Sequence, residues 1–223
     1  MNGITHFLVG IIITIIVWHL LSDKWAEGRN WASKEVFSIK DHPVRMVSLL
    51  RVGITSVLAF FSHIIVDGFA IFTYHPYTNF DNLFYKIWMP SILLSAAIVL
   101  LIALKKDIRY SFGMVFSIFF DLWDHSTLRV VSHLYGGADL GSLYLHQLEW
   151  AFIDRFLAWA PVLYLNPYAA VVEIMIISAL LISWYLLEQR WALPNNTNYQ
   201  TNKYSFIIIA ALIGLWILLG EFF

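Results

Sequence analysis

The chain has 223 residues, of which 60% are hydrophobic and only 13% are charged, and its mean hydropathy is +0.70. Ordinary soluble domains carry about 25% charged residues, so this composition excludes a soluble globular protein and predicts an integral membrane protein. The net charge of −1 gives no reason to expect nucleic acid as a partner. Cysteine is absent, which excludes disulfides and thiolate metal sites, so any metal must be held by nitrogen and oxygen ligands.

Long apolar stretches predict an all-α, polytopic membrane helix bundle. The polar stretches between them are too short to fold separately, so residues 1–223 are expected to form a single integral membrane domain. The N-terminus lacks a basic region and a small-residue cleavage site, which favours a retained first helix over a signal peptide. The six expected spans are Ile4–Leu21, Met46–Tyr74, Tyr85–Leu104, Ile108–Val131, Tyr168–Leu193 and Tyr204–Phe222.

Two polar connections carry aromatic residues at helical spacing. Ser22–Arg45 is mixed in charge and is expected to lie at the membrane interface as a helix. Leu143–Trp159 follows a glycine-rich stretch and is predicted to be an interfacial amphipathic helix. The apolar stripe of the second segment consists of Trp150, Phe152, Phe156, Leu157 and Trp159.

Basic residues are unevenly divided between the two sides of the predicted bundle. The side that holds the second and fourth connections has only Lys86 and Arg155. Because basic loops stay in the cytoplasm, both termini are expected to be non-cytoplasmic, in a protein of the cell (inner) membrane. The other, cytoplasmic side holds Lys24, Arg29, Lys34, Lys40, Arg45, Lys105, Lys106, Arg109, Arg190 and Lys203.

Ionisable residues interrupt the second and fourth spans. His63 and Asp67 are four residues apart and so share one helix face, as do Asp121 and His125. A charge in the hydrocarbon costs from roughly 2.5 kcal/mol upward, so such residues usually face a partner or a cavity. Counted back from the outer ends of their spans, the two pairs lie at nearly equal depth. If the two helices are neighbours, these four residues form one cluster near the external surface.

Two imidazoles and two carboxylates form a ligand set that suits zinc or a similar divalent ion. His6 and His75 also fall on the outer side and are candidates for further ligands. Asp124 is expected to act as a ligand, a partner of a ligand or a catalytic group, and Glu149 or Glu173 as a general base.

Other interpretations of these residues remain open. The pair His63 and Asp67 could instead make a buried hydrogen bond between helices. His133 and His146 fit loop residues as well as ligands, although His146 stands three residues before Glu149 on the predicted interfacial helix.

Short motifs resemble those of a known family. "ITHFLVG" and "FFSHIIVDGF" are similar to the Thr-His and Ser-His-x-x-x-Asp signatures of the membrane-bound metal-dependent hydrolases of bacteria and archaea. That family is distantly similar to zinc-dependent phospholipase C. The resemblance implies that Thr5, His6, Ser62, His63 and Asp67 match motif positions. It also implies that "FDLWDH" stands where the family commonly has Pro-Asp-x-Asp-His.

These observations predict a hydrolase of phosphoester or lipid-like substrates with a divalent metal, most simply zinc, at the outer leaflet. Membrane lipids are then the immediate partners, and Leu143–Trp159 is expected to cover the site as a lid. The alternative is a non-catalytic subunit that contacts other membrane proteins and uses the His/Asp cluster as a structural clamp. A proton or ion pathway is a third possibility, which requires titratable groups in both halves of the membrane.

Overall fold

The computed structural model describes residues 3–39, 42–74, 83–137, 143–163 and 165–191. Within these ranges the protein is mostly helical, as predicted, and it contains four helices that are long and apolar enough to cross a membrane. These are α1 (Gly3–Leu20), α4 (Met46–Gly68) with its 3-10 extension Phe69–Phe72, α5 (Leu83–Lys106) and α10 (Ala169–Trp191). The expected span Tyr204–Phe222 lies outside the described residues.

α1 is the central helix of the bundle. It packs against α4, α5, α10 and the shorter helix α6 (Tyr110–Ser117), and its residues Leu8, Ile11 and Ile15 are completely buried. The large apolar side chains on the outer faces of α4 and α10 are exposed instead. Exposed apolar faces of this length suit contact with lipid, where side chains gain nothing by leaving the hydrocarbon.

Two glycines allow α1 and α6 to cross in close contact. A Cβ atom built on Gly10 would overlap the backbone of Gly113, and one built on Gly113 would overlap the backbone of Gly10. Small residues at such a crossing let two helix backbones approach within van der Waals distance. The crossing brings the N-terminal half of α1 against the end of α6, where the polar cluster described below begins.

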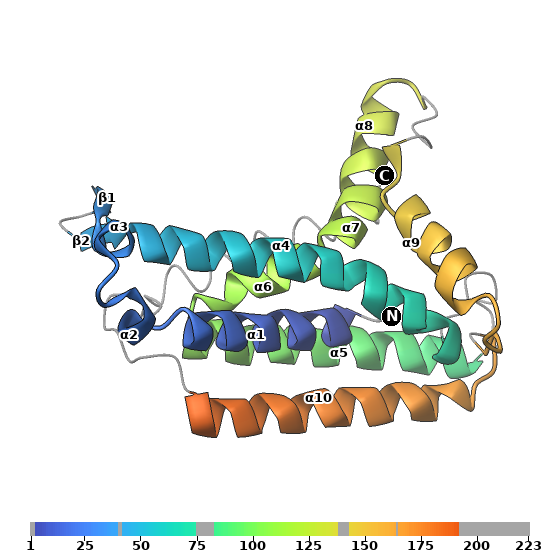
Figure 1. Ribbon diagram of the computed structural model, residues 1–223. Coiled ribbons are helices and arrows are strands. Elements are labelled where there is room, and N and C mark those ends of the chain that lie inside the picture. The colour runs from blue at the N-terminus through green and yellow to red at the C-terminus, as the bar shows by residue number, and fades with distance from the viewer. Residues whose placement is uncertain (1–2, 40–41, 75–82, 138–142, 164, 192–223) are drawn as a thin grey trace.

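The prediction of one continuous span over Ile108–Val131 is wrong. The chain forms α6, then α7 (Phe119–Asp121), a π-helix over Leu122–Thr127, and α8 (Leu128–Leu134). α6 lies along the bundle and α7 still contacts α4, whereas α8 turns away from the bundle, as Figure 1 shows. The bend occurs at Ile118, whose φ of −108° and ψ of 11° depart from α-helical values. π-helical turns often accompany functional sites, because the extra residue re-aims side chains.

The prediction of an interfacial helix over Ser22–Arg45 is also wrong. This segment contains two short helices, α2 (Asp23–Ala26) and α3 (Asn30–Ser33), followed by an antiparallel hairpin of β1 (Glu35–Ile39) and β2 (His42–Arg45). Gly28 has a φ of 78°, a left-handed conformation that ends a helical run. Val36 and Phe37 then favour an extended strand.

The predicted interfacial segment Leu143–Trp159 is helical over a shorter range than expected. Its helix consists of α9 (Gln147–Phe152) and a π-helical turn over Ile153–Leu157. α9 packs on the C-terminal part of α4, and the ring of Phe152 lies against Gly68. Exposed apolar side chains of this segment are Leu148, Trp150, Phe156 and Trp159.

The described basic residues of the predicted cytoplasmic side gather at one end of the bundle. Figure 1 shows the C-terminal ends of α1, α5 and α10 and the start of α4 together at the end that carries α2, α3 and the hairpin. This end holds more buried polar groups than the sequence suggested. Arg51 binds Asp23 and the Leu21 carbonyl, and Glu188 accepts hydrogen bonds from Tyr110, Lys106 and Trp184.

Candidate metal centre

Helix α4 supplies two donors that lie one helical turn apart. His63 Nε2 is 3.2 Å from Asp67 Oδ2, and the His63 side chain is completely buried. The other ring nitrogen, Nδ1, lies 2.6 Å from the Ser117 carbonyl oxygen at the end of α6. A carbonyl can only accept, so Nδ1 carries a proton, and a metal ion bound beside Asp67 would use the lone pair of Nε2. Metal-binding histidines are oriented by this kind of contact.

The other two donors come from α7 and from the residue that precedes α9. His146 Nε2 lies 3.3 Å from Asp121 Oδ1 and 4.0 Å from Asp67 Oδ2. Its Nδ1 lies 2.5 Å from Asp124 Oδ2, and Asp124 also accepts the backbone N–H groups of Leu145 and His146. Asp124 is buried and fixes both the ring and the backbone of this segment. His146 therefore presents Nε2 to the cluster in the same way as His63.

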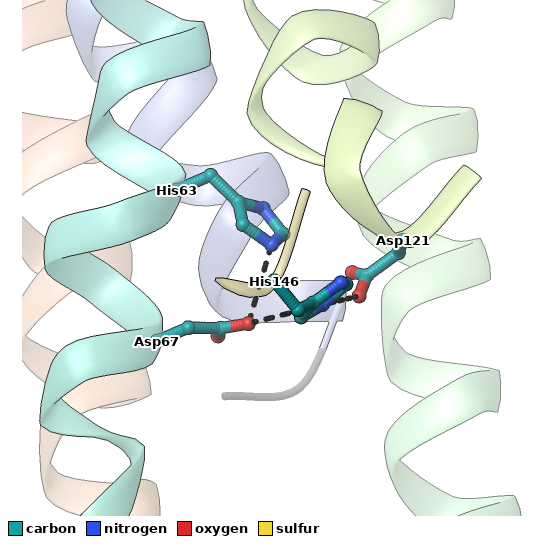
Figure 2. Close-up of side chains that lie close together, drawn as sticks. All are labelled: His63, Asp67, Asp121 and His146. Atoms are coloured by element: carbon teal, nitrogen blue, oxygen red, sulfur yellow. Dashed lines mark ion pairs between the residues drawn. The ribbon is translucent and has the colours of Figure 1, made fainter. Parts of the chain in front are cut away.

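Together these residues form what we term the four-donor group, which consists of His63, Asp67, Asp121 and His146 (Figure 2). One ligand atom from each lies within 4.8 Å of every other. Ligands about 2.0–2.1 Å from a tetrahedral ion stand roughly 3.3 Å apart. The separations of 3.2 and 3.3 Å match that spacing, and 4.0 Å would need a small adjustment. The group can hold a metal ion.

The four-donor group is buried on one side and accessible on the other. The His63 side chain is 0% exposed, whereas His146 is 21% and Asp121 36% exposed. The ring of Phe120 stacks on His63 with a centroid separation of 4.7 Å and forms part of the inner wall. A ligand from outside would therefore meet Asp121 and His146 first.

His6 contacts this group from α1. Its Nε2 is 2.9 Å from Asp67 Oδ1, and its ring stacks on His63 with centroids 4.2 Å apart. His6 therefore contacts the four donors through Asp67. It contacts Oδ1 of that carboxylate, whereas His63 contacts Oδ2.

The structure brings three of the predicted ligands together, namely His63, Asp67 and Asp121, and adds His146. For His146 the sequence left a loop residue and a ligand as open alternatives. The signal that could have found it was its position three residues before Glu149 on an amphipathic helix.

The other residues predicted for the site do not belong to the four-donor group, or lie outside the described residues. Asp124 lies beside the group as the partner of His146. Glu173, a predicted general base, is completely buried on α10 and is not one of the four donors. His75 and the side chains of His125 and Glu149 lie outside the described residues.

Comparison of the chain with protein-family models, with curated proteins and with solved structures gives no match.

Proposed function

We propose that this protein is a membrane-embedded, metal-dependent hydrolase of phosphoester or lipid-like substrates, related to the membrane-bound metal-dependent hydrolases that its motifs resemble. The observation that carries the proposal is the four-donor group, in which two imidazoles are each held at Nδ1 and turn Nε2 toward two carboxylates. Two nitrogen and two oxygen donors within 4.8 Å of one another suit zinc.

Each residue of the site has a distinct part in this proposal. A bound divalent ion would acidify a water molecule and polarise the oxygen of the scissile bond. His63 and Asp67 hold the buried side of the ion, and Asp121 lies on the accessible side where substrate arrives. Asp124 keeps His146 in the tautomer that presents a lone pair. Glu149 is proposed as the general base, because it follows His146 by three residues at the start of α9.

A lipid substrate is supported by the surroundings of the site. After the ligand His146, α9 exposes Trp150 and the following π-helical turn exposes Phe156, and aromatic side chains of this kind favour the lipid headgroup region. The basic ends of the helices lie at the opposite end of the bundle, which supports a site in the outer leaflet with both termini non-cytoplasmic. α9 is then the lid beneath which substrate enters.

The proposal is tested by hydrolysis with detergent-purified protein. The wild type and Asp121→Ala are stripped of metal, reloaded with zinc and offered vesicles that contain phosphatidylcholine and phosphatidylglycerol. Their products are compared with those from His133→Ala, which changes an exposed histidine of α8 outside the four-donor group. Zinc-dependent release of a headgroup or fatty acid by the wild type and His133→Ala, but not by Asp121→Ala, supports the proposal. Equal release by all three contradicts it.

A second function is favoured by the number of donors. Structural zinc sites are closed by four protein ligands, whereas catalytic sites usually keep one position for water. The four-donor group could complete such a shell, as expected of a clamp in a non-catalytic subunit that binds other membrane proteins. Zinc-loaded protein that resists thermal unfolding but releases no product from any vesicle would favour this alternative.

A proton pathway has less support. Titratable groups do occur at both ends of the bundle, but the apolar residues Leu8, Ile11, Ile15 and Met114 fill the core between them. At about 1.5 Å per residue, the segment of α1 from His6 to Trp18 spans roughly 18 Å without another ionisable side chain.

A further inference from the structure

His6 lies behind the four-donor group and contacts two of its members. Its ring is completely buried and stacks on that of His63, with centroids 4.2 Å apart and planes 16° apart. Its Nε2 lies 2.9 Å from Asp67 Oδ1. An ionised carboxylate only accepts hydrogen bonds, so Nε2 carries the proton in this contact. His6 therefore donates to one oxygen of Asp67 while the other oxygen, Oδ2, faces His63 and His146.

A third helix fixes the position of His6. The hydroxyl of Ser117 donates to the His6 carbonyl oxygen across 2.7 Å, and the Ser117 carbonyl accepts the Nδ1–H of His63 across 2.6 Å. One residue thus joins the backbone of α1 to the ring of a ligand on α4. The crossing of Gly10 and Gly113, one turn away along each helix, brings the two backbones close enough for this bond.

The second ring nitrogen of His6 has no such partner. Nδ1 is buried and makes no hydrogen bond within the described part of the chain. A buried polar atom without a partner lowers stability, whereas a phenylalanine ring could fill the same space without that loss. Stacking alone therefore does not account for an imidazole at this position. The contact of Nε2 with Asp67 does.

We infer that His6 is a positioning residue for Asp67 and is not itself a ligand of the ion. Its N–H group occupies Oδ1, so that Asp67 offers the ion a single oxygen, Oδ2. A carboxylate left free to rotate could bind with both oxygens and occupy a second position on the ion. This inference rests on metal binding at the four-donor group, as proposed above, but not on hydrolysis.

The test is a Co²⁺ titration of metal-stripped protein in detergent, followed by visible absorption, because the d–d bands of Co²⁺ report the number and geometry of its ligands. Two variants separate the functions of the ring. His6→Gln keeps an N–H donor close to the place of Nε2 but has no ring, whereas His6→Phe keeps a stacking ring but has no donor. His19→Gln and His19→Phe are matched controls, because His19 stacks on Trp191 with centroids 4.3 Å apart at the other end of α1.

We expect His6→Gln to bind Co²⁺ with the wild-type spectrum and nearly wild-type affinity. His6→Phe is expected to bind about 10- to 100-fold more weakly, the usual effect of losing a partner that orients a ligand, with a changed spectrum. Both His19 variants should match the wild type. Thermal unfolding of each protein is recorded in parallel to identify variants that do not fold.

Four results would overturn the inference. A changed spectrum in His6→Gln would make His6 a ligand, and this result does not depend on whether His6→Phe folds. Unchanged affinity and spectrum in His6→Phe would reduce His6 to a packing residue. Equal losses in the His6 and His19 variants would indicate a general effect on α1. A wild type that binds no Co²⁺ would instead contradict the proposed function, and the inference with it.

Discussion

Asp124 and His146 are joined by a hydrogen bond of 2.5 Å between Oδ2 and Nδ1, although 22 residues separate them in the chain. The same carboxylate accepts the backbone N–H groups of Leu145 and His146, each across 2.9 Å. Asp124 thereby fixes the segment that enters α9 and sets the tautomer of a donor in the four-donor group. Asp124 lies in the π-helix Leu122–Thr127.

Replacing Asp124 by asparagine should weaken metal binding with little change in shape. The new side-chain amide can donate to Nδ1 of His146, which would move the ring proton to Nε2, the nitrogen that faces the site. We expect about a 10- to 100-fold loss of zinc affinity in a competition titration with a chelating dye. Asp154→Asn, an exposed change on the π-helical turn after α9, is the control and should leave affinity unchanged. Similar affinities for both variants would remove the orienting role of Asp124.

The crossing of α1 and α6 should not tolerate a methyl group. Gly10→Ala and Gly113→Ala each place a Cβ atom against backbone that cannot move aside easily, so we expect a loss of about 1–3 kcal/mol in the free energy of unfolding. Thermal unfolding in detergent measures this loss. Gly53→Ala is the matched control, because a Cβ atom there meets nothing within 4 Å. If all three alanines behave alike, the close crossing is not a feature of the folded protein.

Phe152 should hold α9 on the bundle. Its ring lies against Gly68, next to an apolar cluster of Ile71, Leu157 and Ala160. Phe152→Ala is expected to increase amide hydrogen exchange across Gln147–Leu157, whereas Trp150→Ala, at an exposed position of the same helix, should not. Exchange that rises equally in both variants, or in neither, would show that this contact does not dock the proposed lid.

The polar network at the opposite end should affect stability without affecting metal. Glu188→Ala removes the acceptor of Tyr110 and Trp184 and leaves buried donors unsatisfied, which costs about 1–3 kcal/mol. We expect a lower unfolding temperature and unchanged metal content by elemental analysis. Glu27→Ala, at an exposed position, should change neither. Loss of metal in Glu188→Ala would mean that the site depends on the fold as a whole.

Much of the site could be predicted from helical spacing and depth. His63 and Asp67 lie one turn apart on an apolar helix, and counting residues from the outer end of each span brought Asp121 to the same depth. These arguments need only the rise of a helix and the cost of charge in lipid. They succeeded because α4 is a regular helix, and because α7 stays beside it despite the bend.

The contribution of His146 could not be predicted in the same way. Its position depends on the packing of α9 on α4. No periodicity in the sequence predicts that packing. The bend at Ile118 and the π-helix after Asp121 also change the direction and register of a segment that the sequence suggested was continuous. A prediction that assumed a regular helix could therefore not include the hydrogen bond between Asp124 and His146.

Hydrolysis at the four-donor group requires a bound divalent ion. The most direct test for this ion is elemental analysis of detergent-purified protein grown with added zinc, comparing the wild type with His63→Ala and Asp121→Ala. His133→Ala serves as the histidine control. We predict about one divalent ion per chain in the wild type and in His133→Ala, and almost none in the other two variants. A wild type free of metal, or equal metal in all four proteins, would show that the four-donor group is not a metal site.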